Sequence, residues 1–174
     1  MSRERLKAIP VAVNVSARQF RQPDFDVRIR SIIDAAGVDP SLIELEITES
    51  QLMHDPQHAI RMLGNLRAAG MSIAIDDFGT GYSSLAYLTR FPLAALKIDR
   101  SFVKDVLSDQ ADAMIVRTIV DMAKQLGLKV VGEGVETTEQ ASFLRELGCE
   151  QAQGYLFAKP MPADDLVGFF SNAA

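Results

Sequence analysis

Polar side chains interrupt or end the short apolar runs of this sequence, and their types are those of a metal site. Four of them offer oxygen atoms: Asn14 ends VAVN, Glu46 lies within IELEIT, and Asp76 and Asp77 end SIAIDD. Carboxylate and amide oxygens are the ligands that hard cations such as Mg²⁺, Mn²⁺ and Ca²⁺ prefer. Zinc is less favoured, because no histidine or cysteine lies on a predicted strand. The adjacent aspartates can reach two ions, or one ion and its outer shell.

Three further polar residues lie on or beside the later apolar runs. Lys97 lies in ALKID and offers a fixed positive charge for an anionic substrate. Glu133 lies in VVGEGVE and is a spare carboxylate that can act as a base, and Gln153 lies in AQGYLF. Together with the oxygen ligands, these residues suit two-metal phosphoester hydrolysis, in which one ion lowers the pKa of a water and both stabilise the attacking and leaving oxygens.

These polar side chains can form one site only if the secondary-structure elements that carry them bring them together. Burying a charged or amide side chain in a strand costs free energy unless it is paired or metal-bound, so its recurrence on every strand indicates one shared site. In parallel sheets and barrels, that site forms where the carboxyl ends of the strands converge. The apolar, β-branched runs predict six strands: Val11–Ser16, Ile43–Thr48, Ser72–Asp76, Ala95–Asp99, Lys129–Gly134 and Ala152–Phe157.

Segments with helical periodicity separate these strands. Four of the five predicted helices end at a glycine, and Thr137 and Gln140 have the spacing of a capping box. The strands recur about every 28 residues, which is the size of one strand–helix unit. The sequence therefore predicts one α/β domain over residues 1–174 with a mostly parallel sheet, either doubly wound or closed as a barrel. The predicted helices are Phe25–Ala36, Pro56–Ala69, Ala111–Leu126, Thr137–Leu147 and Ala163–Phe170.

Composition excludes several classes of protein. The net charge of −5, from 23 acidic and 18 basic residues, argues against a duplex-DNA-binding surface. The longest apolar runs have the length of strands, so no membrane span is expected, and the N-terminal MSRERLKAIPVAV lacks a signal-peptide pattern. Cys149 is the single cysteine and cannot form an internal disulfide. The expectation is a cytoplasmic domain, either by itself or as the cytoplasmic part of a larger membrane-anchored protein.

Some of the candidate site residues also have a purely structural explanation. Asp76 and Asp77 precede Phe-Gly-Thr-Gly and could be turn residues. Glu49 could serve only as a local hydrogen-bond partner. Lys97 could be the structural partner of Asp99, although a lysine between two apolar residues is rarely buried without a reason.

Other residues with chemical potential are expected to be structural. His54 and His58 have helical spacing, but Pro56 lies between them at a predicted helix start, which argues against metal binding. Cys149 follows a helix-ending glycine and is expected to be a small buried residue. Three methionines at helical positions are expected to lie in the core: Met62, Met114 and Met122.

The order of these segments resembles a known family. VNVSARQF, LEITES, IDDFGTGYSSL, LKIDRSFV, VVGEGVET and QGYLFAKPMP are similar to the successive motifs of EAL domains, over Val11 to about Pro162. The resemblance implies a TIM-type (β/α)8 barrel with one antiparallel strand. It also implies hydrolysis of cyclic di-GMP to linear pGpG with Mg²⁺ or Mn²⁺, in bacterial second-messenger signalling.

The resemblance assigns roles to the oxygen ligands and to the residues around them. Asn14, Glu46 and Asp76 would bind metal, and Asp77 would help to hold a second ion. Lys97 would position the nucleophilic water and contact phosphate. The remaining two catalytic assignments are Glu133, as a general base or a ligand of the second-metal water network, and Gln153, near the attacking water.

The resemblance also implies supporting roles. Glu49 would anchor the loop after Asp77, which the family uses to couple dimerisation to the site. Glu136 would support the site from behind the metal ligands or contact guanine. Arg18 and Asp99 would contribute to substrate binding, and Phe20 would border the ligand groove.

The sequence departs from the family at its start. The Glu-Ala-Leu strand that gives the family its name lies upstream of the segment matching VNVS, and its glutamate is a metal ligand; only ten residues precede Val11. About six of eight strands are expected, with the first one or two β/α units absent and two sheet edges open. Two expectations follow: a fragment of a longer protein with an upstream sensory or cyclase domain, or a homodimer in which a second copy covers the edges.

Two functions therefore remain open. The first is a metal-dependent cyclic di-GMP phosphodiesterase, supported by the complete set of downstream site residues. The second is a catalytically impaired cyclic di-GMP receptor or protein-interaction module, supported by the missing ligand strand.

Overall fold

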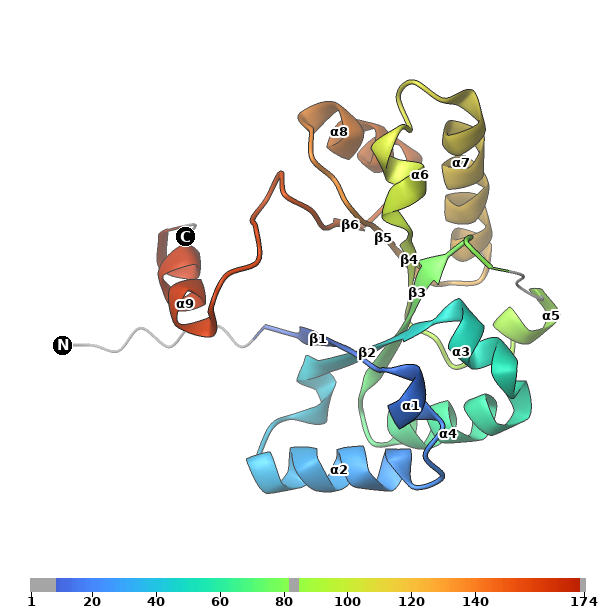
Figure 1. Cartoon of the computed structure of the whole chain (residues 1–174), viewed down its shortest axis with the longest axis vertical. Coiled ribbons are helices and arrows are strands. Elements are labelled where there is room, and N and C mark those ends of the chain that lie inside the picture. The colour runs from blue at the N-terminus through green and yellow to red at the C-terminus, as the bar shows by residue number, and fades with distance from the viewer. Residues whose placement is uncertain (1–8, 82–84, 173–174) are drawn as a thin grey trace.

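Six parallel strands form one curled sheet. The computed structural model describes residues 9–81 and 85–172; Met1–Ala8 of the N-terminal segment and Tyr82–Ser84 of the IDDFGTGYSSL segment lie outside the described residues. The sheet curves like part of a barrel wall (Figure 1), and its spatial order β1-β2-β3-β4-β5-β6 follows the chain. The strands are β1 (Val11–Asn14), β2 (Ile43–Thr48), β3 (Ser72–Phe78), β4 (Ala95–Ile98), β5 (Lys129–Gly132) and β6 (Gln151–Ala152).

The predicted α/β class and the six strands are confirmed. Every pairing between neighbouring strands is parallel, so the antiparallel strand that the family resemblance implies is not among the strands of the described residues. Parallel pairing in chain order requires a crossover between each pair of strands, and helices supply these connections. This topology places the carboxyl ends of all six strands at the same edge of the sheet.

The longer helices lie outside the curve of the sheet, whereas the last helix lies apart from it (Figure 1). Apolar residues of β2, β3 and β4 pack against this outer layer and form the core together with Leu63, Leu66 and Val120. The helices are α1 (Ala17–Phe20), α2 (Phe25–Ala36), α3 (Glu49–His54), α4 (Pro56–Ala68), α5 (Leu85–Leu88), α6 (Arg100–Lys104), α7 (Gln110–Gln125), α8 (Thr138–Leu147) and α9 (Ala163–Asn172), with a 3-10 turn at Pro40–Leu42.

Local sequence signals explain where several helices begin and end. The capping box predicted for α8 is present: the Gln140 N–H donates to the Thr137 hydroxyl, and the Thr137 N–H donates to the Gln140 side chain. Asp55 caps α4, whose first residue is Pro56, so His54 and His58 lie on different helices. Gly37 and Gly148 end α2 and α8 in the left-handed conformation that glycine adopts without strain.

Two predictions about structure are wrong. The strand predicted over Ala152–Phe157 ends at Ala152, because the chain turns at Gly154, where a β-carbon would lie 2.1 Å from the carbonyl oxygen of Val135. Met114 is 63% exposed rather than buried, since α7 turns Val116 and Val120 toward the core. Met62 is buried, and Met122 and Cys149 are partly buried and pack against the core.

Candidate functional site

Four consecutive strands bring their polar residues together around one buried ammonium group. Lys97 on β4 contacts Glu46 on β2, Asp76 on β3 and Glu133 directly after β5. Its Nζ lies 2.7 Å from Glu46 Oε1, 3.2 Å from Asp76 Oδ1 and 2.5 Å from Glu133 Oε1. The lysine side chain is 4% exposed. The predicted convergence of these four residues at the carboxyl edge of the sheet is therefore confirmed in space.

Glu46, Asp76 and Glu133 form a carboxylate cluster around Lys97. Burial and the charges of the cluster shift the pKa values of Lys97 and Glu133. Burial alone would lower the pKa of Lys97, but hydrogen bonds to Glu133 and Glu46 and their negative charges raise that pKa above its usual value. Burial raises the pKa of Glu133, and the charges of Asp76 and Glu46 add to this effect, while Lys97 opposes it. The lysine thus remains charged, and Glu133 binds a proton more readily than an ordinary glutamate, because its pKa is raised.

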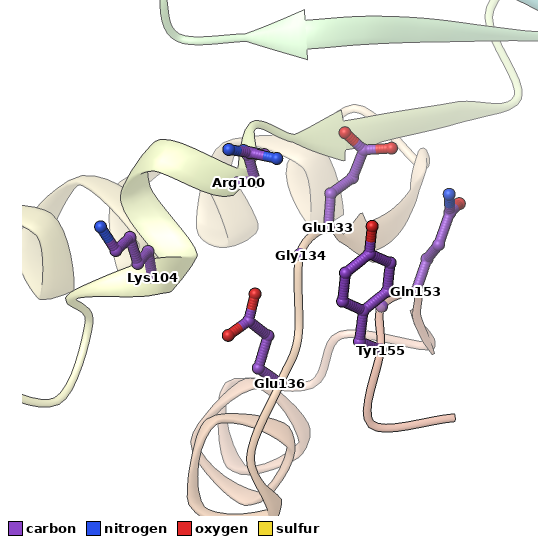
Figure 2. A pocket seen from close by; sticks show the side chains of 8 residues that line it. Arg100, Lys104, Glu133, Gly134, Glu136, Gln153 and Tyr155 are labelled. Carbon is purple, nitrogen blue, oxygen red and sulfur yellow. The ribbon is translucent and has the colours of Figure 1, made fainter. Parts of the chain in front are cut away.

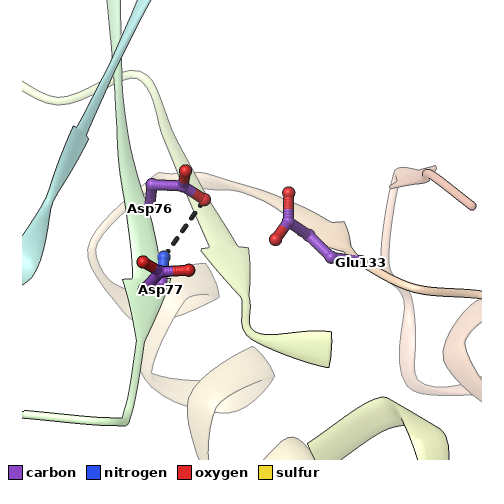
Figure 3. A group of neighbouring side chains, drawn as sticks. All are labelled: Asp76, Asp77 and Glu133. Atoms are coloured by element: carbon purple, nitrogen blue, oxygen red, sulfur yellow. Dashed lines mark hydrogen bonds between the residues drawn. The ribbon is translucent and has the colours of Figure 1, made fainter. Parts of the chain in front are cut away.

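Asp77 follows Asp76 with an unusual backbone. Its φ of 52° makes it the non-glycine residue with positive φ in the described chain, a conformation that stores strain and is found at functional sites. The Asp77 N–H donates to Asp76 Oδ1 over 3.1 Å (Figure 3). Burial, followed by the charges of Asp76 and Asp99, raises the pKa of Asp77. The turn therefore holds two successive carboxylates on the same side of the sheet edge.

A divalent cation fits the acidic residues at this edge. Asp76, Asp77 and Glu133 each present a carboxylate oxygen, and these three oxygens lie within 4.8 Å of one another. Figure 3 shows the three side chains facing a common space. Within the described part of the chain this is the one group of acidic, histidine or cysteine side chains close enough to share an ion. An all-oxygen donor set suits Mg²⁺, Mn²⁺ or Ca²⁺ rather than Zn²⁺.

Asn14 lies next to this cluster on the neighbouring strand. It pairs in register with Glu46 across β1 and β2, and the Val15 N–H donates to the Glu46 carbonyl over 2.9 Å. The residue is exposed. Asn14 thus lies beside Glu46, and its assignment as a metal ligand stays a prediction.

Glu49 is buried at the start of α3 and reaches the segment after β3. Its Oε2 accepts a hydrogen bond from the Gly79 N–H over 3.3 Å, while its Oε1 is buried without a hydrogen-bond partner in the described residues. A β-carbon on Gly81 would lie 3.0 Å from that oxygen. The carboxylate therefore holds the end of β3 close to α3.

A cleft opens beside Glu133 on the β5–β6 side of the sheet. Its volume is about 290 Å³, and the predicted residues Glu136 and Gln153 line it (Figure 2). Sequence reasoning missed three further lining side chains: Arg100, Lys104 and Tyr155. The signal for Arg100 was its position directly after the ALKID strand, at the edge where the other site residues lie.

The other substrate-binding candidates, Arg18, Phe20 and Asp99, do not line this cleft. Arg18 is exposed on α1, and Phe20 is buried, with its ring edge against Phe25. Asp99 caps α6 by accepting from the Ser101 N–H over 2.8 Å. Burial alone would raise the pKa of Asp99, but hydrogen bonds from Ser101 lower it overall.

The ion pairs of Lys97 in the described chain are those with Glu46, Asp76 and Glu133. The alternative in which Lys97 is the structural partner of Asp99 is therefore wrong. No helix in residues 9–81 and 85–172 combines the length and the apolar character that crossing a membrane requires.

Comparison with known proteins gives one consistent family. The family model of the EAL domain matches residues 1–160. The chain is 49% identical over 166 residues to the cyclic di-GMP phosphodiesterase NbdA of Pseudomonas aeruginosa, and 40% identical over 153 residues to the cyclic di-GMP phosphodiesterase PdeR of Escherichia coli. These matches cover 95% and 88% of this chain but 21% and 23% of the relatives. The chain thus spans about a fifth of the length of these curated relatives.

Solved structures agree in fold. A MucR phosphodiesterase in complex with c-di-GMP superposes with a TM-score of 0.88 at 46% identity, over 90% of this chain and 64% of that one. The BlrP1 protein of Klebsiella pneumoniae, in complex with manganese and cyclic di-GMP, gives a TM-score of 0.78 at 36% identity, over 87% of this chain and 39% of that one. The match of the EAL model over residues 1–160 and the agreement in fold with these solved structures lead to one conclusion: this chain belongs to the EAL domain family.

Proposed function

We propose that this chain is a metal-dependent phosphodiesterase module that hydrolyses cyclic di-GMP to linear pGpG. The observation that carries the proposal is the grouping of Asp76, Asp77 and Glu133 oxygens within 4.8 Å, beside a cleft with two cationic side chains. Such a site offers a place for a cation and a place for an anionic nucleotide. The named cyclic di-GMP phosphodiesterases among the relatives support the choice of substrate.

Asp76, Asp77 and Glu133 would hold the metal, with Glu46 and Asn14 on the neighbouring strands as further oxygen ligands. Mg²⁺ or Mn²⁺, when bound, neutralises charge on the phosphodiester and lowers the pKa of a water molecule.

The protein residues supply positioning and proton transfer. Lys97 holds a positive charge at the edge where a phosphate oxygen would approach. Glu133 contacts Lys97 and lines the cleft, so its carboxylate is placed to accept a proton from a water molecule there. Gln153, at the cleft wall, can orient a water or a phosphate oxygen through its amide.

The cleft beside Glu133 suits a nucleotide. Arg100 and Lys104 provide positive charge for phosphate, and the ring of Tyr155 offers a face on which a base can stack. Its volume of about 290 Å³ is near the lower end of the range for small-molecule sites. The cyclic dinucleotide would therefore place one base in this cleft and its scissile phosphate near Glu133.

The decisive experiment measures conversion of cyclic di-GMP to pGpG by liquid chromatography with added MnCl₂ or MgCl₂. Glu133→Gln should lower the rate by about 100-fold or more, because the general base is lost. Lys129→Gln, an exposed lysine on β5, is the matched control and should leave the rate unchanged. Absence of turnover by a folded protein that still binds cyclic di-GMP would refute the enzyme proposal.

That outcome would favour the second candidate, a non-catalytic cyclic di-GMP receptor. The observation that favours it is the position of Lys97, which already neutralises part of the negative charge that attracts a metal. Calorimetry separates the two candidates. Binding of cyclic di-GMP without hydrolysis identifies a receptor, and binding followed by product formation identifies the enzyme.

A further inference from the structure

The buried ammonium of Lys97 uses the same carboxylates that would bind a metal. Of the three residues whose oxygens lie within 4.8 Å of one another, Asp76 and Glu133 each form an ion pair with Lys97. Glu46, on the neighbouring strand, forms the third ion pair. An ammonium has three N–H donors and no acceptor, so three carboxylate partners use all of its hydrogen-bonding capacity.

We infer that Lys97 is the resident counter-cation of the carboxylate cluster, and that a divalent metal ion binds by exchanging with its ammonium group. The inference rests on the proposed function only in taking this cluster to be the metal site. It assigns to Lys97 a second role, that of setting the metal affinity, beside its role toward the substrate.

The charges of the cluster support this exchange. Glu46, Asp76 and Glu133 carry three negative charges, and Lys97 balances one of them in a site where the four side chains are 4–16% exposed. Buried carboxylates without a counter-charge are costly, so Lys97 keeps them ionised and close together before a metal arrives. A metal ion and an ammonium on the same oxygens repel each other strongly at this depth. Each therefore weakens the binding of the other.

The exchange has a consequence for the ligand. An ammonium that gives up its contacts with Asp76 and Glu133 lies at the carboxyl edge of β4, close to the cleft that Glu133 lines. Its released N–H donors can then bind a phosphate oxygen. Metal binding would thereby convert Lys97 from an internal counter-ion into a cation that faces an anionic ligand, so metal and phosphate ligand favour each other's binding.

Calorimetric titration with MnCl₂ alone tests this inference without any substrate. Lys97→Met keeps the length of the side chain and removes its charge, and it should raise the Mn²⁺ affinity by about tenfold or more. Lys97→Arg keeps the charge and should not raise the affinity. Lys129→Met is the matched control on β5, and its affinity should equal that of the unchanged protein. Equal or weaker Mn²⁺ binding by a folded Lys97→Met protein would overturn the inference.

Because Lys97→Met leaves three carboxylates without their cation, circular dichroism must first show that it folds without metal. A second measurement on the unchanged protein covers the case in which it does not. The ¹⁵N-lysine side-chain NMR signal of Lys97 should be protected from solvent exchange without metal and should shift saturably as MgCl₂ is added. A signal that stays constant while calorimetry shows Mg²⁺ saturation, or no binding of either ion at millimolar concentration, would also overturn it.

These readouts are independent of the reaction. If Lys97→Met gains Mn²⁺ affinity while the unchanged protein does not hydrolyse cyclic di-GMP, the exchange stands and the phosphodiesterase proposal fails. If hydrolysis occurs and the affinity of Lys97→Met is unchanged, the phosphodiesterase proposal stands and the exchange fails.

Discussion

The carboxylate of Glu49 accepts a hydrogen bond from the backbone N–H of Gly79 over 3.3 Å, which joins the start of α3 to the segment that follows β3. This contact lies two residues beyond Asp77, whose backbone carries positive φ. A change at Glu49 can therefore reach the edge that carries Asp76, Asp77 and Glu133 through the chain, although Glu49 is not one of these three grouped carboxylates.

Glu49→Ala should lower the hydrolysis rate by about tenfold or more, because residues that orient metal ligands contribute on this scale. The direct measurement is hydrogen exchange of the Gly79 amide, which should become faster when its acceptor is removed. Glu44→Ala on the neighbouring strand, where Glu44 accepts from Ser72, is a control for loss of a carboxylate. Unchanged exchange at Gly79 would show that the hydrogen bond does not hold this segment.

Asp77→Asn should stabilise the metal-free protein and weaken metal binding. Asparagine tolerates positive φ, so the backbone is kept, while the burial of a charge and the repulsion from Asp76 and Asp99, which raise the pKa of Asp77, disappear. The gain in the free energy of unfolding is about 0.5 kcal/mol, because solvent screens much of the repulsion. Urea unfolding with EDTA measures it. A loss of stability without metal would contradict the prediction.

Thr137→Ala should lower the free energy of unfolding by about 1 kcal/mol, since it removes the hydroxyl that caps α8. Urea denaturation at constant pH measures the change. Thr138→Ala, one residue later and outside the capping box, serves as the control and should change stability much less. Equal effects of the two substitutions would show that the capping box is not the source of the stability.

Cys149 should react slowly with thiol reagents at neutral pH. Burial, together with the charge of Glu150, raises the pKa of the Cys149 thiol from 9.0 to about 11. The thiolate is therefore scarce in the folded protein below that value, and the reaction rate should rise with pH up to about 11. The unfolded chain releases the proton first, so the contribution of this thiol to stability is complete below pH 9 and is lost as the pH rises toward 11. A folded protein that reacts as fast as the urea-unfolded chain at pH 8 would contradict this prediction.

The chain should associate through β1. Val11 and Val13 are 53% and 43% exposed, and within the described residues β1 pairs with β2 alone. Unpaired strand edges with apolar side chains favour pairing with another chain. Light scattering after size-exclusion chromatography should show a mass that rises with concentration, and Val13→Lys should reduce it. A monomer at every concentration would refute this prediction.

The fold and the central cluster could be predicted because the sequence encodes them by repetition. Each of the six apolar runs carries or precedes a polar residue, and parallel strands place such residues at one edge. The structure therefore brings together, as predicted, the side chains of Glu46, Asp76, Lys97 and Glu133. The predicted helix Phe25–Ala36 was correct to the residue, since its periodicity spans three turns and ends at a glycine.

Other features could not be predicted, for physical reasons. The helices α1, α3 and α6 have four to six residues, too few to show an amphipathic period. Lys97 and Asp99 share a face in an ideal strand, but Asp99 lies beyond the end of β4 and its carboxylate caps α6 instead. Met114 is at a helical position, and periodicity alone could not show that it lies on the solvent-facing side of α7, while the neighbouring Ala113 and Ile115 pack against the core.

The strand order β1 to β6 repeats the order of the chain, and this has a consequence for folding. Each strand pairs with a partner one unit away, so the sheet can assemble by adding units in succession. The carboxylate cluster draws on four consecutive units and exists only once all four are in register. The unfolded chain has no comparable site, so a metal that binds as proposed would stabilise the folded state by about 2.7 kcal/mol when its concentration is 100 times its dissociation constant. Metal would thus raise the free energy of unfolding of the strands that carry the site residues, which Lys97 already holds together without it.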